Sequence, residues 1–343
     1  MHKKIKRFFY AVPTPLAGLA LGIASLGIGL ENTLSLDNLV QFFSAILSMI
    51  LVCILLGKYI LHPQMLKDDV AHPVVGSILP TIAMALMLQT KTISFVSQTA
   101  AELVWLFAVF LHFALMFGFV FHRVRDFSLK QMVPSWFVPF VGIGVAAVTV
   151  PNGVYHDLAY AIFVFGLINY AIILPIMVYR LIFAEEINDN FKPTIAILAA
   201  PASLSLMAYL SLEQNPSLLL CSILFGIAIL MTVIIYIAFF KLLRLPFSPG
   251  FAAYTFPMAV GAASLIKVSE VLATYPLLIQ YSWEVHVMGI IEMVIATCVC
   301  IYVVVSFILY YVRAWKSIVM ARRAANMDDE CFDDECLECF SKC

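Results

Sequence analysis

The chain has 343 residues, of which 63% are hydrophobic and 12% are charged, and its formal net charge is −1. A soluble domain carries roughly 25% charged residues, so this composition excludes an ordinary soluble protein. Apolar runs of about 18 to 28 residues alternate with short polar segments, and each run is long enough to cross a hydrocarbon core of ~30 Å. The sequence predicts an all-α integral membrane protein.

The chain begins with the basic segment 1–11, which contains HKKIKR before the first apolar run. This could pass for a signal peptide, but the run that follows is too long, contains Pro13 and Pro15, and has no convincing A-x-A cleavage site. We therefore expect a retained first span. Residues 12–313 then form one transmembrane domain with ten predicted spans: 12–30, 36–60, 73–90, 99–122, 134–151, 156–181, 193–211, 217–241, 250–268 and 283–312.

Lysines and arginines predict the orientation of these spans, because basic residues collect in cytoplasmic loops. With the N-terminus in the cytoplasm and ten alternating spans, all but two of the 20 basic residues fall on the inner side. The two exceptions are Lys91 and Lys267. Both termini are therefore expected to be cytoplasmic, in a multi-pass protein of the cell (plasma or inner) membrane.

Each odd-numbered span carries a proline in or near its first half, followed by Ala, Gly, Ser or Thr. These prolines are Pro15, Pro80, Pro139, Pro201 and Pro257, at intervals of 65, 59, 62 and 56 residues. A repeat of about sixty residues predicts five helical hairpins. A proline inside a membrane helix produces a kink, which is tolerated where protein or a water-filled cavity receives the freed carbonyl.

Five kinked helices at similar depth predict a quasi-five-fold inner ring around a central pore. The even-numbered spans are rich in Leu, Ile, Val and Phe, which suits an outer ring that faces lipid. The alternative is generic helix packing, because Pro and Gly are common in membrane helices.

Ten spans, five helix pairs and the sequence "YTFPMA" in the ninth span resemble the tellurite-resistance/dicarboxylate transporter family, which includes TehA-like proteins, plant slow anion channels and fungal malate and sulfite transporters. The resemblance covers about residues 10 to 313. It implies a homotrimer in which each protomer has its own pore, and a gate formed by the phenylalanine that matches Phe256. The alternative for Phe256 is a core or lipid-facing aromatic side chain.

Lys267 lies eleven residues beyond Phe256, and eleven steps of ~100° return to nearly the same helix face. Val260 and Ala263 fall on the stripe between them. A cation at the outer mouth would attract anions. Snorkelling to the headgroups, or pairing with Glu270, is the alternative. The polar residues that we expect to line the pore are Thr14, Thr81, Ser203, Ser205, Thr255 and Ser264.

Glu102, His112 and Glu292 are ionisable residues in even-numbered spans that could act in transport. Buried His and Glu can relay protons, but we expect His112 and Glu292 to make structural hydrogen bonds or protomer contacts, and Glu102 to be interfacial. His62, His72 and His122 lie near the cytoplasmic face without a metal-ligand spacing, which argues against a membrane metalloenzyme.

Residues 314–343 form an acidic tail with Cys331, Cys336, Cys339 and Cys343 in the spacing C-x4-C-x2-C-x3-C. Reduced cytoplasmic thiols bind soft metals, so a metal site is one interpretation and a tail with incidental cysteines is the other. No cofactor is expected.

These features together predict a channel or transporter for small inorganic anions or mono- and dicarboxylates, and not an enzyme. The expected partners are small anions and the lipid bilayer, and no nucleic acid. Two alternatives stay open. One is a proton-coupled carrier or exporter of C4-dicarboxylate, sulfite or tellurite-type oxyanions, and the other is a non-transporting membrane sensor or scaffold that signals through its Cys-rich tail.

Overall fold

The computed structural model describes residues 6, 8–151 and 153–325, with side chains as far as Arg313. The α-helices are α2 (Leu16–Leu34), α3 (Leu39–Leu61), α4 (Pro63–Ala71), α5 (Val75–Ile78), α6 (Thr81–Ile93), α7 (Gln98–Arg125), α8 (Phe137–Val141), α9 (Val145–Val148), α10 (His156–Phe183), α11 (Ala200–Leu212), α12 (Leu218–Leu242), α13 (Thr255–Thr274) and α14 (Ile279–Ala325). The short 3₁₀ segments are η1 (Leu129–Gln131), η2 (Pro134–Trp136), η3 (Gly142–Gly144), η4 (Lys192–Ala199) and η5 (Pro249–Tyr254).

The described residues contain eight helices that are long and apolar enough to cross a membrane, or nine if a bent pair counts as one span. That pair joins Pro63–Ala71 to Val75–Ile93 at an angle of 103°. The predicted span 134–151 coincides with the shorter apolar stretch Pro134–Val148, which is divided among η2, α8, η3 and α9. The all-helical, multi-span membrane class is confirmed, while the number of spans counted by length is eight or nine.

The odd-numbered predicted spans begin irregularly. η4 leads into α11 and η5 into α13, and 3₁₀-type hydrogen bonds such as Leu16 N to Pro13 O precede α2. Each repeat proline lies within the first turn of an α-helix or directly before it: Pro15 and Pro80 are N-caps of α2 and α6, and Pro139, Pro201 and Pro257 are early residues of α8, α11 and α13. Proline is accommodated there because its missing N–H would have no helical partner. The prolines therefore mark changes of helix type rather than bends within continuous α-helices.

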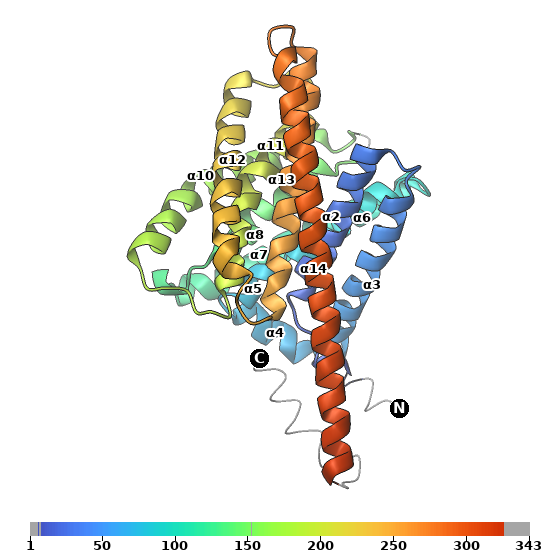
Figure 1. Cartoon of the computed structure of the whole chain (residues 1–343), viewed down its shortest axis with the longest axis vertical. Helices are drawn as coiled ribbons and strands as arrows, with labels where there is room; N and C mark the ends of the chain where they lie inside the picture. The colour runs from blue at the N-terminus through green and yellow to red at the C-terminus, as the bar shows by residue number, and fades with distance from the viewer. Residues whose placement is uncertain (1–5, 7, 152, 326–343) are drawn as a thin grey trace.

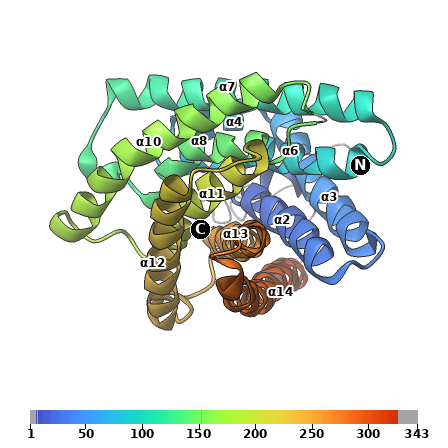
Figure 2. The ribbon, with the colours of Figure 1, turned by 90° about the horizontal axis from the view of Figure 1, so that it is seen from above.

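The helices form two layers, as the view from above in Figure 2 makes clear. The spans Leu16–Leu34, Lys192–Leu212 and Pro249–Thr274 are 67%, 83% and 67% buried. The spans built on α3, α7, α10, α12 and α14 are 33% buried or less, and large hydrophobic side chains cover their exposed faces. This alternation agrees with the predicted inner and outer positions, since apolar side chains that face lipid need no protein cover.

The inner helices contact one another in sequence. α2 packs on α6 and on α13, α13 packs on α11, α11 packs on α9, and α9 packs on α6. Small residues permit close approach, because a Cβ at Gly142 would lie 2.7 Å from Sδ of Met84, and one at Gly22 would overlap the Thr255 side chain. These contacts bring residues from five segments of the chain around one central region.

Side chains from α7 satisfy the backbone of the interrupted segment Pro134–Val148. His112 Nε2 lies 3.0 Å from the Pro139 carbonyl oxygen, and Trp105 Nε1 donates to the Ala146 carbonyl at 3.1 Å. Both side chains are completely buried. A broken helix is tolerated at membrane depth when protein groups pair its freed carbonyls, so His112 makes the structural hydrogen bond that its sequence position predicts.

The start of α2 and the end of α14 lie at the same end of the molecule, at the bottom of Figure 1, and we call this end the base. Near the base, Lys58 of α3 is 3% exposed. Its Nζ lies 3.1 Å from Oδ2 of Asp69 in α4 and 2.9 Å from Oγ1 of Thr14, and the Tyr59 hydroxyl donates to the same Asp69 oxygen at 2.9 Å. The pair joins α3 to α4, and Thr14 adds the segment before α2. Lys58 is a buried cation that requires the charge of the partly buried Asp69.

Two more buried cations, Arg123 and Arg180, end outer helices near the base. Each bonds the segment that follows its own helix and the segment that follows the previous outer helix. Arg123 donates to the Gln131 side chain and to the carbonyl of Ala71, the last residue of α4. Arg180 donates to the Glu185 and Lys130 carbonyls. We call these two arginines with Lys58 the base clasps. They connect the loops after α3, α7 and α10 in series.

Candidate pore

A cavity lies at the centre of the inner helices. It is lined by residues from all five odd-numbered predicted spans: Pro15, Gly18, Leu21, Ile78, Thr81, Met84, Phe137, Val138, Val141, Gly142, Ile197, Ala200, Pro201, Leu204, Gly250, Ala252, Ala253, Phe256 and Pro257. About 60 Å³ of this first cavity is open to the centres of water molecules, whereas one water requires ~10–15 Å³. The first cavity therefore has room for several waters or a small ion, inside walls that are almost entirely apolar.

A second cavity follows further along the same helices, with about 40 Å³ open to the centres of water molecules. Its lining again comes from α2, α6, α9, α11 and α13: Ser25, Ile28, Gly29, Asn32, Leu88, Val145, Val148, Leu204, Met207, Phe256, Val260 and Ala263. These residues lie later in α2, α11 and α13 than those of the first cavity. Because α2 begins at the base, the second cavity lies further from the base than the first.

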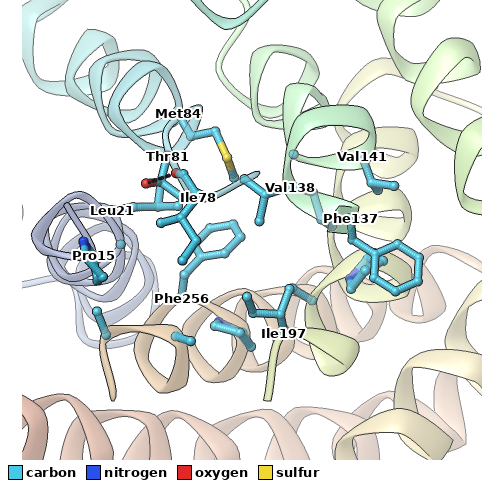
Figure 3. A pocket seen from close by; sticks show the side chains of 18 of the residues that line it. Pro15, Leu21, Ile78, Thr81, Met84, Phe137, Val138, Val141, Ile197 and Phe256 are labelled. Atoms are coloured by element: carbon cyan, nitrogen blue, oxygen red, sulfur yellow. Dashed lines mark hydrogen bonds between the residues drawn. The ribbon is translucent and has the colours of Figure 1, made fainter. Parts of the chain in front are cut away.

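Phe256 and Leu204 line both cavities. Phe256 projects from α13 toward Ile78 and the centre of the first cavity, as Figure 3 shows. Its side chain is 7% exposed and lies among apolar neighbours. Phe256 thus contributes to the walls of both cavities.

The stripe predicted on α13 faces the second cavity, since Phe256, Val260 and Ala263 all line it. Lys267 lies one turn beyond Ala263, and its Nζ is 2.9 Å from a carboxylate oxygen of Glu270. Both partners are partly exposed to the surroundings of the helix end. Lys267 therefore pairs with Glu270, which the sequence analysis gave as an alternative to attracting anions.

Lys91 is a cation that our pore prediction did not include. It is an exposed residue in the last turn of α6, and it is close enough to Lys267 for the two charges to interact. The sequence signal was present, because Lys91 and Lys267 were the only two basic residues on the predicted outer side. At the end of the molecule opposite the base, these two cations therefore lie near each other, and one of them is paired with Glu270.

The six polar residues that were predicted to line the pore lie in different surroundings. Of these six, Thr81 alone is among the described residues that line either cavity, and its hydroxyl donates to the Ile78 carbonyl. Thr14 belongs to the Lys58 cluster. The hydroxyls of Ser203, Thr255 and Ser264 donate to carbonyls of their own helices or of the adjoining η segment, and Ser205 is buried. Among the prolines, Pro15, Pro201 and Pro257 line the first cavity.

Gly22 sets the distance between α2 and the first turn of α13. A Cβ at this position would overlap the Thr255 hydroxyl and lie 3.1 Å from the Phe256 backbone nitrogen. We expect Gly22→Val to lower the free energy of unfolding by about 1–3 kcal/mol, because overpacking forces neighbouring groups apart. The melting temperature in detergent measures this effect. Gly226→Val is the control, because no atom lies within 4 Å of a Cβ there, and equal melting temperatures for both variants would contradict the prediction.

Within the described residues, no group of three or more His, Cys, Asp or Glu side chains is arranged to hold a metal ion. His62 contacts the Lys6 carbonyl, His72 accepts backbone N–H groups of Val74 and Val75, and His122 packs on Phe121. Outside the spans, burial lowers the pKa of His72. The four tail cysteines, Cys331, Cys336, Cys339 and Cys343, lie outside the described residues.

Glu292 lies in α14, 5% exposed, with its carboxyl group against Gly261 of α13. Glu102 lies in the second turn of α7, 3.5 Å from the Gln98 amide nitrogen. Neither residue lines either cavity in the described part of the chain.

Comparison of the sequence with known proteins identifies relatives of this chain. The sequence profile of a family described as "SLAC1: Voltage-dependent anion channel" matches residues 9–308. An uncharacterized transporter of Methanocaldococcus jannaschii is 24% identical over 259 residues, which cover 68% of this chain and 75% of that protein. A tellurite resistance protein TehA homolog of Haemophilus influenzae is 26% identical over 270 residues, covering 74% of this chain and 80% of that protein.

Proposed function

Because the chain belongs to the voltage-dependent anion channel family, we propose that it conducts small anions through a single pore in each protomer. Membership of this family confirms the resemblance read from the sequence. The pore runs through the first cavity, past Phe256, and through the second cavity. Family membership makes the protein a membrane anion channel or transporter rather than an enzyme.

The proposed architecture is ten spans arranged as five helical hairpins around the pore, in quasi-five-fold symmetry. The shorter segment Pro134–Val148, which is fifth in chain order, brings the count from nine spans to ten. The support is the series of contacts from α2 through α6, α9, α11 and α13 back to α2, and the contributions of all five segments to both cavities. The five prolines place irregular backbone next to the pore, where it need not face lipid.

Phe256 is the proposed gate. The observation that carries this proposal is that the Phe256 side chain lines both cavities at once, from the helix that also presents Val260 and Ala263 to the second cavity. An apolar ring at a constriction between apolar walls excludes water, and hydrophobic constrictions of this kind gate channels by dewetting. Movement of the ring or of the first turn of α13 joins the two spaces.

The base is the proposed cytoplasmic side, with both termini inside the cell. Lys267 and Lys91 then lie at the outer mouth, where they raise the local concentration of anions. Glu270 neutralises part of this charge. Homotrimeric assembly is also a proposal, taken from the family resemblance, and the exposed apolar faces of the outer helices are available both to lipid and to other protomers.

The apolar lining predicts which anions pass most readily. Because the walls offer few donors to replace lost hydration, the barrier rises with the free energy of dehydrating the ion. We expect iodide and nitrate to permeate faster than chloride, and sulfate to permeate least, by a factor of about ten for each ~1.4 kcal/mol of added barrier. Reversal potentials in planar bilayers give this order, and a preference for sulfate over nitrate would contradict it.

The proposed function is tested by reconstituting the purified full chain in liposomes and measuring flux of chloride, nitrate, sulfite, malate and tellurite. Anion flux that needs no proton gradient supports a channel. Flux that occurs only with a proton gradient would support the coupled carrier instead. Absence of flux with every anion, for a protein that elutes as one well-folded species, would favour a sensor or scaffold and overturn the proposal.

A further inference from the structure

Glu292 is a buried carboxyl group that neither cavity uses. It lies in the middle of the membrane part of α14, and its Oε1 is buried without a hydrogen-bond partner among the described residues. An isolated carboxylate in hydrocarbon is very costly, and ionisable groups at membrane depth are rare without a role. The carboxyl group at this site is therefore most stable when it carries a proton and is neutral.

The carboxyl group contacts the helix that carries Phe256. A Cβ at Gly261 would overlap Oε1 of Glu292, so this glycine provides the space that the carboxyl group fills. Gly261 is five residues from Phe256 and directly follows Val260, which lines the second cavity. The side chain thus lies behind the turn of α13 whose front forms the wall of the pore.

A second unpartnered polar atom faces the same site from α12. The Tyr236 hydroxyl is buried without a hydrogen-bond partner in the described structure, and it is close enough to Glu292 for their charges to interact. Other ionisable groups on the elements around this part of α14 have partners of their own. Lys267 pairs with Glu270, Glu31 accepts from the Asn38 backbone, Tyr254 donates to the Leu242 carbonyl, and His286 contacts Ser269. Lys241 lies in the last turn of α12. Among the side chains that the structure describes, no cation is paired with Glu292.

We infer that Glu292 is a proton-binding site that controls the gate helix: the protonated carboxyl group keeps α13 packed on α14 with the pore closed, and loss of the proton opens the pore. The proton leaves the carboxyl oxygen for water. The carboxylate that remains requires more hydrogen-bond donors than the Tyr236 hydroxyl alone supplies, so α13 and α14 separate to admit water molecules. Because Phe256 is carried by α13, this separation displaces the ring. The inference rests on the proposed function.

The test is anion flux from liposomes that contain the wild-type chain, Glu292→Gln or Glu284→Gln, measured between pH 5 and pH 9. Glutamine keeps the shape of the neutral acid and cannot ionise. We expect wild-type flux to rise with pH, by up to about tenfold per unit below the midpoint since one carboxyl group titrates, and Glu292→Gln to stay low at every pH. Glu284, an exposed glutamate two turns away on the same helix, should behave as wild type after substitution.

A double variant separates the possible failures. Phe256→Ala combined with Glu292→Gln should conduct well at all pH values, which shows that the glutamine variant folds and acts through the gate. A wild-type flux that does not vary with pH, or a pH response retained by Glu292→Gln, overturns the inference while the channel function stands. If Phe256→Ala itself conducts nothing, the proposed function fails instead. Infrared spectra provide a readout besides flux, because the wild-type chain should lose a protonated-carboxyl band as pH rises and Glu292→Gln should lack that band.

Discussion

Phe256→Ala should raise anion conductance at least about tenfold, which corresponds to a barrier lower by about 1.4 kcal/mol. The ring lines both cavities and is 7% exposed, so its removal leaves open space at the boundary between them. The new space connects two cavities that already have room for water molecules. Single-channel recordings in planar bilayers, at fixed pH and with symmetric chloride or nitrate, measure the change.

Phe137→Ala is the matched control. Phe137 lines the first cavity alone, so the same deletion there enlarges one chamber and leaves the boundary in place. Its conductance should stay within about twofold of wild type, because the proposed gate at Phe256 is still in place. Equal gains in the two variants, or no gain in Phe256→Ala, would remove Phe256 from the gate.

The second large effect concerns the buried ion pair near the base. Asp69→Ala leaves the ammonium group of Lys58 buried without its counter-charge, and breaking a buried pair from one side typically costs about 3–5 kcal/mol. We expect the free energy of unfolding to fall by about that amount. Thermal unfolding in detergent, followed by intrinsic fluorescence, measures the loss.

Two further variants separate charge from packing. Asp68→Ala removes an exposed neighbouring carboxylate that bonds Gln64, and it should leave the melting temperature nearly unchanged. Lys58→Met in the Asp69→Ala background removes the uncompensated cation and should restore much of the stability, since replacing both charges by apolar groups is often neutral. If the double variant is no more stable than Asp69→Ala, the loss does not arise from an unpaired charge.

Sequence reasoning recovered the membrane class from the apolar character of long segments, and the family from the number and pairing of the spans together with "YTFPMA". The alternation of more buried and more exposed spans was also expected from their composition. Sequence reasoning also placed Phe256, Val260 and Ala263 on one face, since a helical repeat of 100° per residue fixes that stripe once α13 is a regular helix. These inferences use local geometry alone, which the order of the residues determines.

The starts of the inner helices were harder to predict. A proline in an apolar run is compatible with a kink in mid-helix and with the first turn of a new helix, and the choice between 3₁₀ and α geometry at η4 and η5 depends on tertiary contacts. The Lys58 cluster needed three segments to meet. One signal for it was present, because Lys58 is flanked by apolar residues on both sides in "CILLGKYIL", which is unusual for a surface lysine.

The base clasps divide the molecule into parts with different freedom. Lys58, Arg123 and Arg180 tie the loops after α3, α7 and α10 to their predecessors, whereas the basic residues at the end of α12, Lys241 and Arg244, are exposed. The first three hairpins form an anchored sector, and the sector made of α12, α13 and α14 is fastened mainly by apolar packing. Apolar surfaces can slide without breaking directional bonds, so conformational change in this protein should be confined to that last sector while the rest serves as a fixed frame.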